Sequence, residues 1–229
     1  IDALESVWDV LGAPTRIEIA AQQKLQQIWL PSGESIAVRR AEIVVGKAAS
    51  FTLFALADAA TYGRIELDIS LHENSSFEFN AAIIGGGNST NEIVTTMRHL
   101  EPNAVSRQTV RSVLGGIATG TYLGKVAVAR GADGTDAVQS VKAMLLNRGA
   151  TANAKPELEI YADDVQCAHG ATVGEIDAQQ LFYAAARGLP PAAAKAMLLE
   201  GFVGGLWDAL GEESDIAVAA RDALHEVTR

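Results

Sequence analysis

Hydrophobic and polar residues alternate along most of this chain, and a period of two is the pattern of β-strands with one buried face. The clearest run spans residues 65–71, where isoleucine and leucine alternate with charged or polar residues. Similar runs recur at 17–19, 42–45, 51–54, 77–79, 93–97, 105–113, 122–128 and 141–146. Glycine, proline, asparagine and aspartate, which favour turns, lie between them. No amphipathic helix of convincing length interrupts residues 16–175, so the sequence predicts a large β body there.

The architecture of this β body stays open on the pattern alone. The strands begin at uneven intervals of about 12 to 18 residues. A sandwich, a jelly roll and a parallel β-helix are all compatible with such short strands. No strict internal repeat decides among them.

After Gly174 the hydrophobic period becomes that of helices. A first helix is expected after Asp177, whose carboxylate is placed to accept from free backbone N–H groups, and it should end at Gly188. A second helix is expected from residue 191 to about 210, and a third from Ser214. The second helix should bury Leu198, Phe202, Leu206 and Leu210.

These patterns divide the chain into three parts. Residues 1–15 are interpreted as a short connector or helix remnant, because a weak helical periodicity there ends at Gly12 and Pro14. Residues 16–175 form the β body, and residues 176–229 form a small C-terminal helical region.

Most side chains that can carry chemistry lie in one stretch, residues 155–174, which holds the single cysteine of the chain. A strand there would place Cys167 and His169 on the same side of the backbone, with Cα atoms roughly 6.5 Å apart. A thiolate and an imidazole at this spacing are able to bind one metal ion. Two ligands make an incomplete site, so the others must come from elsewhere in the chain or from a partner. A lone cysteine is, however, more often an inert buried residue.

Asp163 and Asp164 offer a second candidate, a carboxylate pair for acid–base chemistry of the kind found in β-helix enzymes that act on acidic sugars. Adjacent strand residues point to opposite faces, so the two carboxylates cannot work together unless the backbone bends. A turn that ends a strand explains them better. The other histidines, His72, His99 and His225, are interpreted as structural.

Charge and composition exclude several classes of function. The chain carries 18 basic and 28 acidic residues, a formal net charge of −10, which repels nucleic acid. It contains no apolar run long enough to span a membrane and no targeting signal, and one cysteine fits a reducing compartment, so we expect a soluble cytoplasmic protein. Residues 120–126 lack the spacing and the hydroxyl residue of a phosphate-binding loop, which argues against ATP binding.

The stretch from Pro156 to Gly174 reads Pro-x-Leu-Glu-Ile-x-Ala-Asp-Asp-Val-x-Cys-x-His-Gly-Ala-Thr-Val-Gly, and Leu181-Phe182-Tyr183 and Arg187-Gly188 follow it. This long pattern resembles the SufB/SufD family of iron–sulfur cluster assembly proteins, and within it the SufD branch. In SufB the matching stretch typically has acidic residues flanking the histidine, so Cys167 and Gly170 favour SufD.

The resemblance implies a right-handed parallel β-helix followed by a small C-terminal α-helical region. It implies a non-enzymatic scaffold subunit of the SufBCD complex that pairs with SufB, or with a second copy of itself, and docks the SufC ATPase through its C-terminal helices. Cys167 and His169 would then handle iron or a nascent cluster transiently at a subunit interface, with no cofactor held tightly by this chain alone. Family members usually carry a helical N-terminal region, so the sequence is interpreted as a fragment. The alternatives are a polysaccharide-active β-helix enzyme, a carbohydrate-binding protein and a SufB-like subunit.

Overall fold

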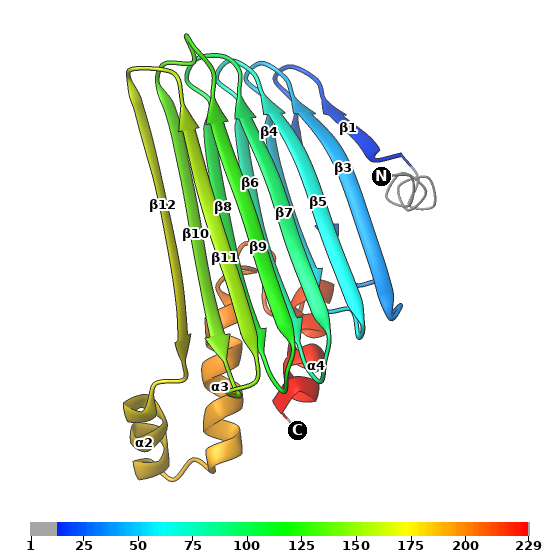
Figure 1. The fold of residues 1–229 in the computed structure, drawn as a ribbon, viewed down its shortest axis with the longest axis vertical. Coiled ribbons are helices and arrows are strands. Elements are labelled where there is room, and N and C mark those ends of the chain that lie inside the picture. The colour runs from blue at the N-terminus through cyan, green and yellow to red at the C-terminus, as the bar shows by residue number, and fades with distance from the viewer. Residues whose placement is uncertain (1–12, 229) are drawn as a thin grey trace.

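The computed structural model describes residues 13–228, and within them twelve β-strands and three α-helices (Figure 1). The helix remnant expected in residues 1–15 lies almost entirely outside this range. The strands are β1 Thr15–Ile19, β2 Lys24–Trp29, β3 Ile36–Val45, β4 Ser50–Ala57, β5 Tyr62–Leu71, β6 Ser76–Gly85, β7 Thr90–His99, β8 Val105–Leu114, β9 Thr119–Val128, β10 Thr135–Leu145, β11 Thr151–Ile160 and β12 Val165–Glu175. The helices are α2 Ala178–Ala186, α3 Pro191–Gly204 and α4 Asp215–Thr228.

Successive strands alternate between two six-stranded sheets, which makes the β body a parallel β-helix. One sheet, called sheet A here, has the order β1-β3-β5-β7-β9-β11, and the other, sheet B, has the order β12-β10-β8-β6-β4-β2. Every strand pairing is parallel. Each coil of the solenoid therefore consists of one strand from each sheet and two short turns. The predicted parallel β-helix is confirmed.

The core of the solenoid is built by the alternation seen in the sequence. In β5 and β7 every second residue is buried, and these residues point between the two sheets. Phe51 and Phe77 occupy stacked positions on neighbouring strands of sheet B, with ring centroids 5.6 Å apart. Such pairs gain about 0.5–1.5 kcal/mol beyond the burial of their area.

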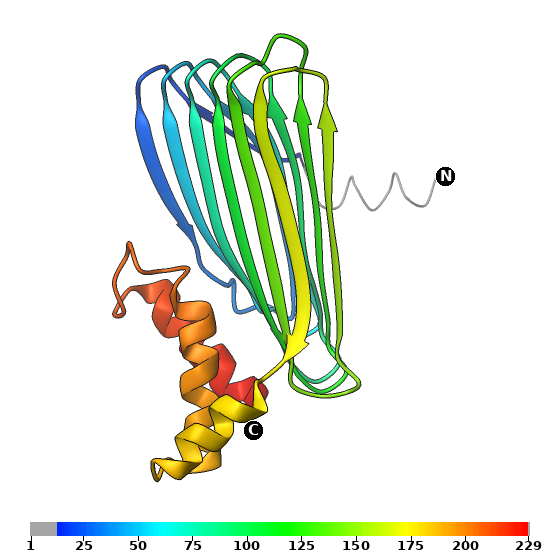
Figure 2. The same ribbon diagram turned by 90° about the vertical axis from the view of Figure 1, so that its left-hand side faces the viewer.

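The outer face of sheet B carries buried apolar side chains where helices cover it. Phe54, Leu56 and Ile84 point outward from β4 and β6 and are buried against α3 and α4. Trp207 follows α3 and packs on Phe54, with ring centroids 6.4 Å apart. Figure 2 shows both helices lying against the lower half of this sheet. The strands beneath them are consequently buried on both faces.

The first expected helix agrees with α2, because Asp177 Oδ1 accepts a hydrogen bond from Gln179 N at 2.8 Å. The second is shorter than expected: α3 ends at Gly204, where two consecutive glycines weaken the helix and turns follow. Its buried face is also different, because Leu199 and Val203 are buried whereas Leu198 and Phe202 are half-buried. The third helix, α4, begins close to Ser214 as expected. No helix in residues 13–228 is long and apolar enough to cross a membrane.

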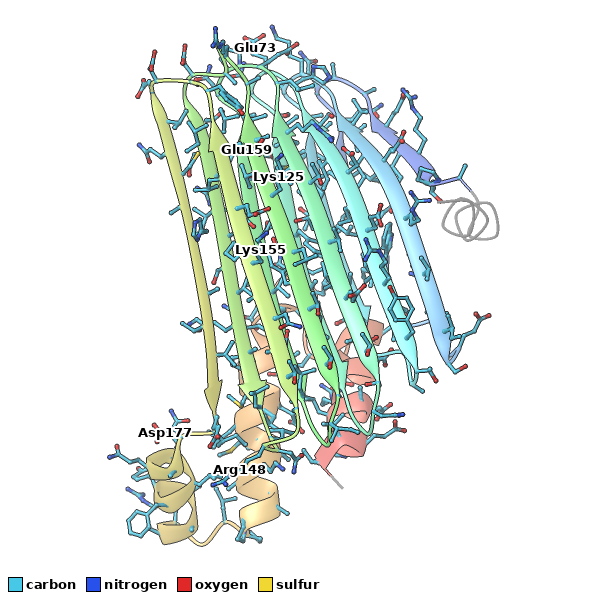
Figure 3. All side chains as sticks on the ribbon, viewed as in Figure 1. Glu73, Lys125, Arg148, Lys155, Glu159 and Asp177 are labelled. Carbon is cyan, nitrogen blue, oxygen red and sulfur yellow. The ribbon has the colours of Figure 1, made fainter. Side chains whose placement is uncertain are left out.

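Sheet A carries its charges as ion pairs on the outer face. Figure 3 shows Lys125, Lys155 and Glu159 there, on β9 and β11. Lys125 Nζ lies 2.7 Å from Glu159 Oε1, and Lys155 Nζ lies 2.9 Å from Glu157 Oε1. Water screens such exposed pairs, so they contribute little to stability and serve mainly to keep this face solvated.

His99 is a buried ionisable group whose environment should make stability depend on pH. It is fully buried on the inner face of β7, with Nε2 2.9 Å from Ser106 Oγ. Burial lowers the pKa of His99 to about 4, although the backbone of Ala104 and the charge of Asp136 oppose the shift. The unfolded chain takes up this proton near pH 6.5, while the folded chain resists it until about pH 4.

We therefore expect the stabilising effect of neutral His99 to be present above pH 6.5 and to be lost as the pH falls through about 4. The loss is at most roughly 3 kcal/mol in the free energy of unfolding. Urea denaturation at several pH values measures it, and His99→Gln should flatten the pH dependence. His225→Gln, at an exposed position on α4, is the matched control and should leave it unchanged. Equal curves for the wild type and His99→Gln would contradict the assignment.

Candidate functional site

The two candidate ligands lie on β12, the last strand of the solenoid. Val165 and Cys167 pack against the core, so the odd-numbered residues of β12 face the interior, and His169 shares this side by the period of two. In the register of sheet B, Cys167 stands next to Ala137 and His169 next to Gln139. Among the strands of residues 13–228, none follows β12 in sheet B, so the coil that holds both residues is open on its far side there. Cys167 is half-buried and His169 is exposed.

The two strands of this last coil present different backbone edges. Thr151 N and Tyr161 N donate to Ala118 O and Val128 O at the two ends of β11. The amides of odd-numbered residues in β11 therefore point toward β9, and those of even-numbered residues point to the open edge. Pro156, which has no N–H, falls on an open-edge position. The proline removes one donor from the middle of the free edge of sheet A.

The open edge of sheet B has no such interruption. Asp136 N and Leu146 N donate to Ala104 O and Leu114 O, so the even-numbered residues of β10 face β8 and the odd-numbered ones face β12. In the register of this pair, the even-numbered residues of β12 bond to β10. The backbone groups of Cys167 and His169 consequently point to the open edge, while their side chains face the interior. An added strand would meet both residues at once.

The thiol of Cys167 is not activated in the isolated chain. Burial raises its pKa above the ordinary value, the charge of Asp136 adds to the rise, and the backbone of Ala137 opposes it. Cys167 is therefore a neutral thiol near pH 7, and a bound metal would have to displace its proton. Within residues 13–228, no three His, Cys, Asp or Glu side chains come together to hold a metal ion. We call the pair the candidate half-site, because two ligands would not complete a metal site.

The structure does not bring Asp163 and Asp164 into a catalytic pair. Both lie in the turn between β11 and β12, and Asp164 O accepts a hydrogen bond from Gly134 N at 2.6 Å. This position agrees with the prediction that the two aspartates belong to a turn that ends a strand.

A buried polar network that the motif analysis missed lies beside the half-site. Tyr122 Oη donates to Gln139 Oε1 at 2.9 Å, and Thr95 Oγ1 donates to Gln108 Oε1 at 2.7 Å. Gln108, Gln139 and His169 occupy the same position in successive coils. The signal in the sequence is their spacing of 31 and 30 residues, one coil of the solenoid each.

A second exposed apolar surface lies on α2 and the start of α3. The side chains of Phe182 and Tyr183 are 76% and 61% exposed, which is unusual for aromatic residues on a helix. A shallow groove of about 450 Å³ beside them is lined by Leu181, Phe182, Ala185, Pro191, Ala192 and Lys195. This surface joins the end of β12 through a short connection that contains Asp177 (Figure 3).

Comparison with known proteins shows which protein family the chain resembles. The family model described as SUF system FeS cluster assembly, SufBD core domain, matches residues 13–202. The iron–sulfur cluster assembly protein SufD of Escherichia coli is 31% identical over 206 residues, which cover 88% of this chain and 48% of that protein. The SufBD family protein slr0076 of Synechocystis is 31% identical over 178 residues, 77% of this chain and 39% of that protein.

SufD of Bacillus subtilis is 29% identical over 121 residues, 53% of this chain and 28% of that protein. The chain spans less than half the length of these curated relatives. The family model covers most of the chain, including the solenoid, the Cys167–His169 strand and α2. The chain therefore belongs to the SufBD family of iron–sulfur cluster assembly proteins.

Proposed function

We propose that this chain is the solenoid part of a SufD-type, non-enzymatic scaffold subunit in iron–sulfur cluster assembly. Its open end pairs with a related solenoid, SufB in the assembly complex or a second copy of this chain in its absence. Cys167 and His169 handle iron or a nascent cluster transiently at that interface, as cargo passed onward rather than as a resident cofactor. The setting is the cytoplasm, where a free thiol stays reduced.

One observation carries this proposal: Cys167 and His169 direct their side chains into the open last coil and their backbone groups to its free edge. A strand added at that edge would bring its own side chains next to both residues. Thiolate and imidazole are suitable ligands for iron and for iron–sulfur clusters, which need more ligands than this pair supplies. The incomplete half-site and the unpaired edge are thus completed by the same partner.

The rival function, a polysaccharide-active β-helix enzyme, has weaker support. It requires paired carboxylates in a groove, and Asp163 and Asp164 instead lie in a turn at one end of the coils. The outer face of sheet A carries carboxylates, but lysine and arginine partners neutralise many of them. These pairs favour a solvated surface over a catalytic groove.

The C-terminal helices supply the docking surface for the SufC ATPase in this proposal. Phe182 and Tyr183 stand exposed beside the groove between α2 and the start of α3. Exposed aromatic side chains next to an apolar groove are typical anchors of protein interfaces. Movement of the ATPase would then reach β12 through the short connection between β12 and α2.

Loss of either candidate ligand should remove the cargo while keeping the complex. We expect Cys167→Ala and His169→Ala to lower the iron and sulfide recovered with full-length protein, SufB and SufC by at least about 10-fold, because even indirect ligand contacts have effects of this size. Anaerobic co-purification with metal and sulfide analysis measures the loss. Ala168→Ser, on the outward side of the same strand, is the control. Unchanged iron and sulfide in both alanine variants would make the pair structural.

The pairing edge is tested by placing a proline where the chain itself uses no hydrogen bond. The amide of Ala171 points to the open edge, so Ala171→Pro should leave the melting temperature within a few degrees and weaken pairing with SufB by about 100-fold or more. Sedimentation and calorimetry measure the association. Thr172→Pro is the contrasting variant, because it removes a bond to β10 and should lower the melting temperature. Intact pairing of Ala171→Pro would exclude this edge as the interface.

The proposed ATPase surface is tested by introducing a negative charge at its centre. Phe182→Asp should reduce the affinity for SufC by at least about 10-fold, since buried aromatic anchors dominate interfaces. It should not lower the melting temperature, because the side chain is 76% exposed. Val218→Asp, at an exposed hydrophobic position on α4, is the matched control and should bind normally. Equal affinities for the wild type and Phe182→Asp would place the SufC contact elsewhere.

A further inference from the structure

Two inward columns of sheet B change from hydrocarbon to polar or small residues between the third coil and the fourth. One inward position of sheet B is occupied in successive coils by Gln27, Leu53, Phe79, Gln108, Gln139 and His169. The neighbouring position is occupied by Leu25, Phe51, Phe77, Ser106, Ala137 and Cys167. Aromatic and aliphatic side chains thus fill both columns in the second and third coils. Polar or small residues replace them in the last three.

The amide of Gln139 is held at both ends across this interior. Its Oε1 accepts from Tyr122 Oη at 2.9 Å, and its Nε2 donates to the carbonyl oxygen of Glu157 at 3.3 Å. Tyr122 comes from β9 and Glu157 from β11, so the side chain reaches from sheet B to sheet A. Tyr122 Oη also lies 3.2 Å from Gln108 Oε1 and 3.3 Å from Thr95 Oγ1. The orientation of the amide is therefore fixed from both sides.

The fold itself does not require this network. Leu53 and Phe79 show that the same column accepts hydrocarbon side chains, and burying amides and hydroxyls costs free energy that their hydrogen bonds only offset. The network also demands a glycine, because a methyl group at Gly124 would collide with Tyr122 Oη and Gln139 Oε1. An arrangement that costs stability and constrains a neighbour calls for another role.

Position in the stack indicates that role. Gln139 stands one strand below His169, about 4.8 Å away along the sheet, in the same inward column. Beyond its contacts with Tyr122 and Glu157, the amide keeps one hydrogen and one carbonyl lone pair. A ring nitrogen of His169 that accepts a hydrogen bond from the Gln139 amide N–H must be unprotonated. A ring nitrogen that donates to the Gln139 carbonyl oxygen must carry a proton. No hydrogen bond joins Gln139 to His169 in the structure as described, so the contact would form when the exposed imidazole turns inward, and either contact would then favour a single tautomer.

We propose that Gln139, oriented by Tyr122 and the carbonyl group of Glu157, is a positioning residue that fixes the ring orientation and tautomer of His169 at the open end. The inference deepens the proposed function, since it takes His169 as the residue that meets the cargo. Hydrogen bonds from neighbouring groups commonly orient ligating histidines in this way and decide which nitrogen is free to bind. Gln139 would act through His169 and need not touch iron or cluster.

The test reads the two ring nitrogens of neutral His169 directly in the full chain. Long-range proton–nitrogen correlation spectra of ¹⁵N-labelled protein at pH 8 report the tautomer ratio, and His169→Asn identifies the signals. We expect one tautomer to predominate in the wild type. Gln139→Met keeps the size of the side chain and removes its hydrogen bonds, so it should shift the ratio roughly five-fold toward that of a free histidine in a short peptide, as expected for loss of one hydrogen bond.

Gln108→Met is the matched control, because it removes an amide from the same column and network one coil further from His169. It should leave the ratio unchanged, whereas a purely structural network would make both variants act alike. Tyr122→Phe, which frees the carbonyl end of the Gln139 amide, should shift the ratio in the same direction, and it carries the test if Gln139→Met does not fold. Melting temperatures establish that each variant is folded.

A wild-type ratio equal to that of a free histidine in a short peptide would overturn the proposal, as would equal effects of Gln139→Met and Gln108→Met. Failure of the proposed function is distinguishable from both results. If His169→Ala retains iron and sulfide in the assembly experiment while Gln139→Met still shifts the ratio, positioning stands and the cargo role falls. If His169→Ala loses the cargo and Gln139→Met changes nothing, the cargo role stands and positioning falls.

Discussion

Each coil of a parallel β-helix is stable only when another layer covers its open side, and the rest of this structure follows from that constraint. In the middle of the stack, every strand bonds to the coil before it and the coil after it, and inward residues such as Ile69 and Phe79 are fully buried. In the described part of the chain, no layer follows the last coil. Its inward residues, including Cys167 and His169, are exposed or only half-buried, and its backbone edges are unpaired. Uncovered strand edges promote aggregation unless something covers them, so the candidate site and the proposed partner both follow from the same physical feature.

The two open edges are not equivalent. Free strand edges invite pairing with any other exposed strand, and natural proteins block those that should stay unpaired. Pro156 removes a donor from the free edge of β11. It leaves the bonds to β9 intact, because it occupies a position whose amide would point to the open edge. The free edge of β12 carries no proline, and it is the edge that bears the backbone groups of Cys167 and His169. The proposed pairing therefore uses sheet B rather than sheet A, and it would bring the partner next to Cys167 and His169.

Much of the fold was predictable from the alternation, and the reasons for the failures are specific. The runs around residues 65–71 and 93–97 lie within β5 and β7, while β2 was missed because Lys24–Trp29 shows little contrast between its two faces. The repeat was hidden because turns of different length change the spacing of equivalent residues from 26 to 31. The end of α3 at Gly204 was missed because the apolar pattern continues through Leu206 and Trp207, which pack on sheet B without being helical. The motif located Cys167 and His169, but only the register of the strands placed Gln139 beneath them.

The change of polarity inside the solenoid links these features to function. A hydrocarbon interior gives stability but leaves a histidine at its end without a hydrogen-bond partner and free to adopt several orientations. A polar interior costs stability, yet it offers fixed dipoles to whatever lies above it. In this chain polar side chains replace hydrocarbon ones in this column between Phe79 and Gln108, and Gln108 lies only two coils before the open end. The early coils with Phe51, Phe77 and Phe79 retain the stabilising core, and the late coils accept the cost where the half-site begins. The early coils thus supply the aromatic part of the core, and the late coils carry the polar column. The open end can therefore be polar while the solenoid below it remains firmly packed.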